Sequence, residues 1–128
     1  MPEISAETVV REFWRLMATN DFHAVRATLA EDFVMEWPQS RERMRGGENF
    51  ARMNAEYPTE GRWRCQVNRL VASGDTVVTQ VRVSDETQSA EPVSFFTVVA
   101  GKITRLVEYW PEPFAAAGNR RHLTEPMA

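Results

Sequence analysis

Residues 63–84 carry the sequence WRCQVNRLVASGDTVVTQVRVS, in which two strand-like segments flank a short polar turn. In the second segment Val77, Thr79 and Val81 alternate with more polar positions, which is typical of a strand that buries one face. The Ser-Gly-Asp sequence at 73–75 favours a tight turn between the two segments. This stretch therefore predicts an antiparallel hairpin at the centre of a sheet.

Outward from this hairpin, the first half of the chain is helical and the second half is strand-like. Ser5 is placed to cap the first helix and Pro58 to end the third. Helices on one side of the sequence and hairpin-connected strands on the other predict an α+β fold, with three N-terminal helices on one face of a sheet. We expect a strongly curved, mixed but mostly antiparallel sheet, a cone with an internal pocket. The expected helices are residues 6–18, 22–29 and 48–57, and the expected strands are residues 33–37, 63–72, 76–84, 93–99 and 103–110. The segments 39–45 and 85–91 are expected to be polar loops.

The length and composition suit one globular domain over residues 1–128, with an irregular tail at 115–128. The chain has 128 residues, of which 43% are hydrophobic and 26% charged, and a net charge of -3. An acidic balance argues against a nucleic-acid partner. No apolar run approaches the roughly 18 residues of a membrane span, and no leader pattern is visible at the start, so we expect no membrane partner and a cytoplasmic location.

The few cysteines and histidines argue against a metal site, and we expect no bound cofactor. The chain has a single cysteine, Cys65, and two histidines, His23 and His122, that lie far apart in sequence. One cysteine excludes an intramolecular disulfide and a cysteine-rich metal site. Cys65 lies within an expected strand and is interpreted as a small buried hydrophobe.

Several short motifs lie along residues 5–114. They are Glu36-Trp37-Pro38-Gln39-Ser40, Gly46, Asn49, Tyr57-Pro58, Gly101-Lys102-Ile103, Glu108-Tyr109-Trp110 and Pro113-Phe114. With these motifs the sequence resembles the nuclear transport factor 2-like superfamily, and within it the SnoaL-like group of small bacterial proteins. The resemblance implies a cone-shaped pocket that takes apolar rings bearing a ketone, epoxide or ester. It also implies a homodimer formed through the outer face of the sheet and a carboxylate base on the pocket floor.

The acids that such relatives use are not at their usual places in this chain. Steroid isomerases of this fold have an aspartate base where this sequence has Trp37, and SnoaL-type cyclases have one where it has Pro111. Epoxide hydrolases use an aspartate-arginine-aspartate set. Arg82 and Glu108 supply two members of that set, while Asp85 has the wrong strand parity for the third.

Glu108 is therefore the main candidate for a catalytic residue. It shares strand parity with Leu106 and Trp110, so an inward orientation places its carboxylate among large apolar side chains. Desolvation there would raise its pKa, which suits a general acid or base. The alternative is a structural ion pair with Arg82 or Arg105.

Glu36 is a weaker catalytic candidate, because alternation points it to the face opposite Trp37. Its alternative is a solvent-facing or arginine-paired carboxylate. Aromatic and polar side chains at several positions are candidates for ligand binding. These are Trp14, Trp37, Tyr57, Gln80, Arg82 and Trp110, for which plain core packing or, for the polar pair, a dimer interface are the alternatives.

These features predict a protein that binds an apolar small molecule in a pocket. It is expected to be an acid–base enzyme of isomerase, cyclase or hydrolase type acting on a cyclic apolar substrate. The alternative is a non-catalytic ligand-binding or dimeric protein-interaction module, since fold alone does not decide function.

Overall fold

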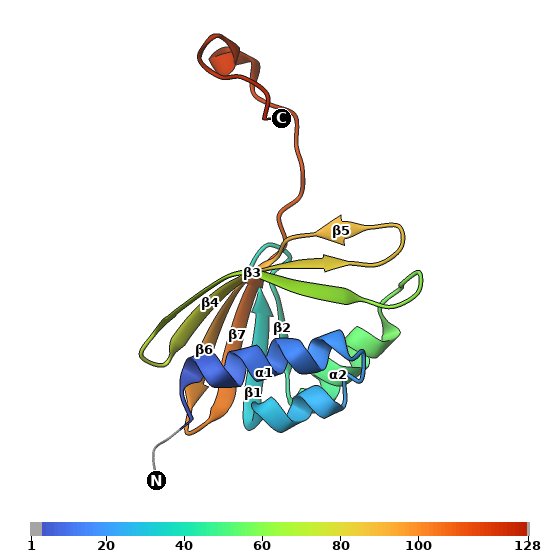
Figure 1. The fold of residues 1–128 in the computed structure, drawn as a ribbon, viewed down its shortest axis with the longest axis vertical. Helices are drawn as coiled ribbons and strands as arrows, with labels where there is room; N and C mark the ends of the chain where they lie inside the picture. Colours follow the sequence, from blue (N-terminus) through green and yellow to red (C-terminus); the bar gives the residue numbers. More distant parts are fainter. Residues whose placement is uncertain (1–3, 128) are drawn as a thin grey trace.

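The computed structural model describes residues 4–127 and has an α+β architecture (Figure 1). Helical segments cover one face of a single seven-stranded sheet. The elements in chain order are α1 (Ala6–Ala18), η1 (Ala24–Thr28), β1 (Leu29–Trp37), β2 (Glu42–Arg45), α2 (Gly47–Glu56), β3 (Arg64–Ser73), β4 (Thr76–Ser84), β5 (Ser89–Ala90), β6 (Val93–Val99), β7 (Lys102–Tyr109) and η2 (Gly118–Leu123).

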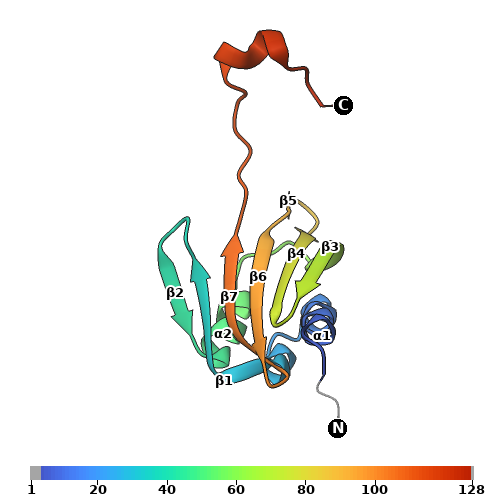
Figure 2. The same ribbon diagram turned by 90° about the vertical axis from the view of Figure 1, so that its left-hand side faces the viewer.

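The sheet is mixed but mostly antiparallel, as the sequence predicts. Its strands lie in the order β2-β1-β7-β6-β4-β3, with β5 paired to β4 (Figure 2). The β1–β7 pair is parallel and the others are antiparallel. The parallel pair places the end of β1 beside the end of β7, although more than 60 residues separate them.

Local sequence explains where the helices begin and how they attach. Ser5 caps α1 through a hydrogen bond from the Thr8 amide to its hydroxyl, 3.1 Å long. After α1, Asn20 adopts a positive φ of 64° and joins the helix end to the start of β3. Its amide donates to the Trp63 carbonyl and accepts from the Trp63 amide, both at 2.8 Å.

The core lies between α1 and the inner face of the sheet, and aromatic rings fill it. The Phe13 ring lies 5.1 Å from the ring of Phe96 and 5.7 Å from that of Phe50, which in turn contacts Phe33. Each of these four side chains is at most 2% exposed. Burying a phenylalanine contributes roughly 1.5–3 kcal/mol, so this cluster anchors the helical layer directly on the sheet.

Four expectations about the elements require correction. The second helix is a short 3-10 turn, and the segment that follows it joins β1 from Leu29 onward. The polar segment 39–45, expected to be a loop, contains β2, which pairs with β1 as an edge hairpin. The polar segment 85–91, also expected to be a loop, contains the short strand β5, which pairs with β4. The tail expected to be irregular contains the 3-10 helix η2.

The sheet is also not strongly curled. β2 and β3 are the two ends of the strand order and do not pair with each other in residues 4–127. The aromatic layer under α1 fills the space that a deeper cone would leave empty. The expectation of strong curvature was therefore wrong.

Candidate functional site

Glu108 points from β7 into the inner side of the sheet, at the end of the strand. It is 5% exposed and shares its face with the fully buried Leu106. Ser94 on β6 is its cross-strand partner and is completely buried. Because most inward side chains of the sheet are apolar, a carboxyl group and a hydroxyl group here form a local polar site.

Three neutral groups bind the carboxyl group of Glu108. The Ser94 hydroxyl lies 2.8 Å from Oε2. The indole Nε1 of Trp110 donates to Oε1 at 2.7 Å, and that of Trp37 donates to the same oxygen at 3.4 Å. Oε1 thus has both of its acceptor positions occupied, whereas Oε2 keeps one for another partner.

Within residues 4–127, no cation forms a salt bridge with Glu108. Burial raises the pKa of Glu108 above its ordinary value of 4.5, and the hydrogen bonds from Ser94, Trp110 and Trp37 offset part of that rise. The site therefore holds a desolvated carboxyl group that neutral donors, rather than an arginine, keep in place.

Two tryptophans lie between Glu108 and solvent. Trp37 ends β1 and is half-buried, while Trp110 follows β7 and is 38% exposed. The backbone amide of Trp110 donates to Oε1 of Gln39 at 2.6 Å, which fixes the chain where it leaves the sheet. These indoles form the wall of the site that faces the outside.

Cys65 lies near the same acid on the inner face of β3. It is half-buried, and burial together with the charge of Glu108 raises the pKa of its thiol to about 11. A thiol with this pKa stays protonated at neutral pH, so it is a poor nucleophile and a poor metal ligand. Among residues 4–127, no group of three or more His, Cys, Asp and Glu side chains could hold a metal ion.

Glu36 lies on the opposite face of the sheet and is paired with arginines. Its carboxylate accepts from Nε of Arg43 at 2.9 Å and from Nε of Arg105 at 3.0 Å. The hydrogen bonds from Arg43 and then Arg105 lower the pKa of Glu36. The two candidate acids are therefore on different faces and cannot act on one ligand together.

Gln80 and Arg82 also lie on the outer face, away from Glu108. Gln80 donates to Glu91 at 3.1 Å, and Arg82 donates to the Ser89 hydroxyl at 3.2 Å. Glu108 lies on the inner face, so neither of these two side chains can line a pocket beside it.

The remaining aromatic candidates have separate positions. Trp14 is buried in the core and donates its indole N–H to the Thr79 hydroxyl at 3.2 Å. Tyr57 ends α2, is 57% exposed, and stacks edge-on near Trp63 with ring centroids 6.2 Å apart. Of the six expected ligand-binding residues, the structure brings only Trp37 and Trp110 into contact with Glu108.

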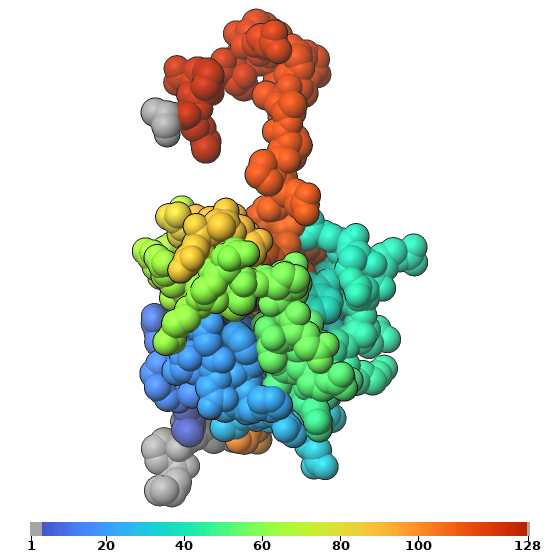
Figure 3. Space-filling view, turned by 90° about the vertical axis from the view of Figure 1, so that its right-hand side faces the viewer, coloured from blue at the N-terminus to red at the C-terminus, as the bar shows by residue number. Residues whose placement is uncertain are grey.

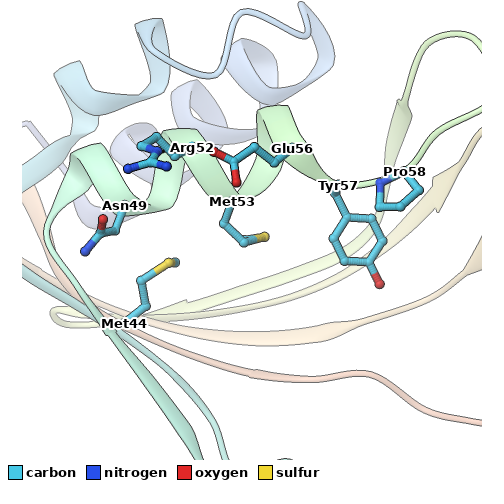
Figure 4. A pocket seen from close by; sticks show the side chains of 7 residues that line it. All are labelled: Met44, Asn49, Arg52, Met53, Glu56, Tyr57 and Pro58. Atoms are coloured by element: carbon cyan, nitrogen blue, oxygen red, sulfur yellow. Dashed lines mark hydrogen bonds and ion pairs between the residues drawn. The ribbon is translucent and has the colours of Figure 1, made fainter.

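A groove with a volume of about 480 Å³ opens between α2 and β2 (Figure 4). Met44 and Met53 face each other across it, and Tyr57 lies at its end. Asn49 and Arg52 lie on the α2 side of the groove. It is an open hollow, not the enclosed cavity that the sequence predicts.

Ser94 and Thr79 are the site residues that sequence reasoning missed. They pair with each other across β6 and β4, so Thr79, Ser94 and Glu108 form a polar row over three strands. Each has the same parity as buried apolar neighbours in its own strand, Val77 and Phe96 among them. A polar residue at a strand position that alternation places on the buried face is the sequence signal that could have identified them.

The fold is that of the nuclear transport factor 2-like, ketosteroid isomerase-like class of proteins. The SnoaL-like domain profile matches residues 10–106, and the chain belongs to this family. No match was found among the curated proteins. No helix of residues 4–127 is long and apolar enough to cross a membrane.

Solved structures with this fold include several named for enzymes. A Kribbella flavida protein described as a candidate ketosteroid isomerase is 30% identical, with a TM-score of 0.88 over 96% of this chain and 90% of that one. An NTF2-like protein of unknown function from Burkholderia xenovorans is 25% identical, with a TM-score of 0.77 over 96% and 95%. An LEH-like epoxide hydrolase from M. tuberculosis is 24% identical, with a TM-score of 0.67 over 83% and 82%, which shows the fold alone.

Proposed function

We propose that the protein binds an apolar cyclic small molecule beside Glu108 and acts on it by acid–base chemistry. The observation that carries this proposal is a buried carboxyl group with no cationic partner, three neutral hydrogen-bond donors and a raised pKa. An acid held only for stability is usually paired or exposed, whereas perturbed acids are common at functional sites.

The hydrogen bonds assign different roles to the two oxygens. Oε1 accepts from both indoles and has no free acceptor position, so it stabilises negative charge on the carboxylate. Oε2 is bound only to Ser94 and is the atom that exchanges a proton with a ligand. A raised pKa favours a carboxyl group that can both accept and return that proton, as an isomerisation requires.

The pocket in this proposal lies on the inner face beyond the aromatic core and opens beside Trp37 and Trp110. Half-buried apolar side chains on that face pack against the core and suit an apolar ring. They are Trp37, Met44, Cys65, Val67, Leu70 and Val83. The name of one structurally similar protein, a candidate ketosteroid isomerase, agrees with a cyclic ligand.

A ligand screen with two variants tests this proposal. We would measure the thermal shift of the purified protein with steroids, aromatic polyketides, terpene epoxides and lactones. Ligand at 100 times its dissociation constant stabilises by about 2.7 kcal/mol, which is a shift of several degrees. Any hit is then assayed for turnover by wild type, Glu108→Gln and Glu36→Gln.

We expect Glu108→Gln to fold and bind but lose turnover by at least 100-fold, since the amide cannot accept the proton. Glu36→Gln, altered on the opposite face, should keep its turnover. Equal turnover by wild type and Glu108→Gln would refute the role of Glu108. No shift with any ligand class would refute the proposed ligand site.

A non-catalytic binding protein is the second candidate. It is favoured by the two indoles, which already satisfy Oε1 and cover the acid from solvent. In that case a ligand would bind wild type and Glu108→Gln equally well, and neither would turn it over.

We further propose a homodimer formed through the outer face of the sheet. An apolar row crosses this face in register, from Val71 through Val78 and Phe95 to Val107. Phe95 is 41% exposed, and the exposed Tyr109 packs against it with ring centroids 6.0 Å apart. An exposed apolar patch with a polar rim is typical of a protein interface. The cytoplasmic location stays a prediction from the sequence.

A further inference from the structure

Residues 111–127 form an arm that stands away from the rest of the protein. Figures 1 and 2 show it rising from the end of β7, and Figure 3 shows it clear of the helices and the sheet. Every residue of the arm is exposed. Within residues 4–127, no hydrogen bond or ion pair joins the arm to the body of its own chain.

The arm carries large apolar side chains with nothing to pack on. Phe114 is 85% exposed, Leu123 is 77% exposed and Met127 is 96% exposed. Leu123 ends the six-residue helix η2, which buries none of its residues against the described part of the chain. An isolated helix of this length is not stable in water, because a short helix gains too few hydrogen bonds to offset its ordering.

The same arm is part of the likeness to solved structures. It makes up more than a tenth of the chain, so a match over 96% of the chain includes most of it. Two such matches, at 30% and 25% identity, reach this far. An exposed apolar segment that does not contact its own domain is typical of a contact with another molecule.

We propose that the arm crosses to a second copy of this chain and packs there against the exposed apolar part of the outer sheet face. The arm begins two residues after Tyr109, which already lies on that face. On the same face Val71 is 67% exposed and Val99 is 53% exposed. Both unsatisfied surfaces, arm and sheet face, are therefore present on one chain.

A second copy satisfies both surfaces with one symmetric contact. In a twofold dimer each chain presents the same two patches, so two arms and two faces are covered together. Burying three large apolar side chains per arm adds to the contact between the sheet faces. This inference rests on the proposed sheet-face dimer and extends it by a reciprocal exchange of arms.

Sedimentation of the full chain over a concentration series tests the exchange. The test variant carries Phe114→Ser, Leu123→Ser and Met127→Ser, which leave the arm at full length and touch no buried residue. The control carries Asn119→Ser and Thr124→Ser, two polar changes in the same arm. We expect a dimer whose dissociation constant rises at least tenfold in the test variant and less than twofold in the control.

Hydrogen exchange gives the second readout. Arm amides should exchange more slowly at concentrations where the protein is dimeric than where it is monomeric, and this protection should vanish in the test variant. An unchanged dissociation constant in the test variant would overturn the exchange and leave a dimer of sheet faces alone. A protein that is still monomeric at about 100 µM would overturn both the exchange of arms and the sheet-face dimer. Either result is independent of ligand binding at Glu108.

Discussion

Glu108 makes the stability of the protein depend on pH in a direction that can be worked out. Its pKa in the folded state is raised above the ordinary value of 4.5. Between those two pKa values the folded state binds more protons than the unfolded state, so this residue's contribution to stability falls as pH rises. Below the ordinary value the contribution is constant.

Glu108→Gln removes this dependence. The amide oxygen can still accept from both indoles, and its NH₂ can donate to the Ser94 hydroxyl. Between the two pKa values, the free energy of unfolding of the variant should rise relative to that of wild type by up to about 1.4 kcal/mol per pH unit. Urea unfolding of both proteins at pH 5, 6, 7 and 8 measures the difference. Parallel stability curves would show that the pKa of Glu108 is not raised into this pH range.

The Ser94 hydroxyl stabilises the ionised form of Glu108. Removing it should shift the pH range over which Glu108 changes the stability of the protein. Its hydroxyl lies 2.8 Å from Oε2, and this hydrogen bond lowers the pKa of Glu108. Ser94→Ala should raise that pKa further and cost about 1–2 kcal/mol at neutral pH. The same urea series checks it, with Ser89→Ala on the outer face as a matched control. If both variants lost the same free energy of unfolding, Ser94 would have no special role in stabilising the Glu108 carboxylate.

At the scale of elements, Asp85 joins the segment after α2 to the turn after β4. Its carboxylate accepts backbone N–H groups of Glu60, Thr87 and Gln88 at 2.8–3.0 Å. The Gln88 side chain adds a further bond at 2.8 Å. Burial acts to raise the pKa of Asp85, but the side-chain bond from Gln88 and the backbone bonds together outweigh it and lower the pKa below 3.8.

Asp85→Ala should loosen both segments without unfolding the sheet. We expect the Tm to fall by several degrees at pH 7. A lowered pKa contributes stability that is present above the ordinary value of 3.8 and is lost as pH falls below it, so wild type and variant should converge in acid. Thermal melts from pH 2.5 to 7 test this, and amide exchange at Glu60, Thr87 and Gln88 should accelerate.

Asp75→Ala is the comparison for this change, because Asp75 is exposed and its carboxylate contacts only the neighbouring Thr76 hydroxyl at 3.2 Å. It should shift the Tm by less than the Asp85 variant does. A similar fall in both would show that the hydrogen-bond cluster is not what holds the segments.

The strands with strict alternation were predictable from sequence, and those without it were not. β4 and β6 lie where the periodicity places them, because each buries one face. β2 carries Glu42, Arg43 and Arg45, is exposed along most of its length, and exists because β1 offers it an edge to pair with. Pairing of this kind depends on distant chain segments and leaves no local pattern.

The candidate site was predictable only in part, for the same reason. The inward position of Glu108 follows from its parity with Leu106, which the sequence displays. The contact with Trp37 depends on the parallel pairing of β1 with β7, which no local pattern encodes. Trp110 lies beyond the end of β7, so the contact between its indole and Glu108 depends on the path of the backbone there and not on strand alternation.

At the scale of the whole molecule, the two faces of the sheet differ in the side chains that they carry and in what covers them. The inner face carries α1, the aromatic core and the polar row that ends in Glu108. The outer face is bare of helices and carries the apolar row that includes Val78 and Phe95. A sheet with an apolar outer face is stable in water when a second copy covers that face, so folding and association should be coupled.

Coupling of this kind makes the Tm depend on protein concentration. Each tenfold rise in concentration should stabilise a dimer by about 1.4 kcal/mol, which is about 2–4 °C for a unit of this size. Phe95→Arg should give a lower Tm that does not change with concentration. A charge on the outer face opposes association, while a side chain that is 41% exposed is not needed for the core. Scanning calorimetry between about 5 and 500 µM measures both proteins.

Tyr57→Arg is the matched control, since Tyr57 is an exposed aromatic residue on the helical side. It should keep the concentration dependence of wild type. A wild-type Tm that stays constant, together with a sedimenting mass near the 14.7 kDa of one chain, would refute the dimer. A concentration-dependent Tm that survives Phe95→Arg would instead place the interface on another face. Because the site at Glu108 lies on the inner face, its ligand-induced shift should persist in Phe95→Arg, which separates binding from association.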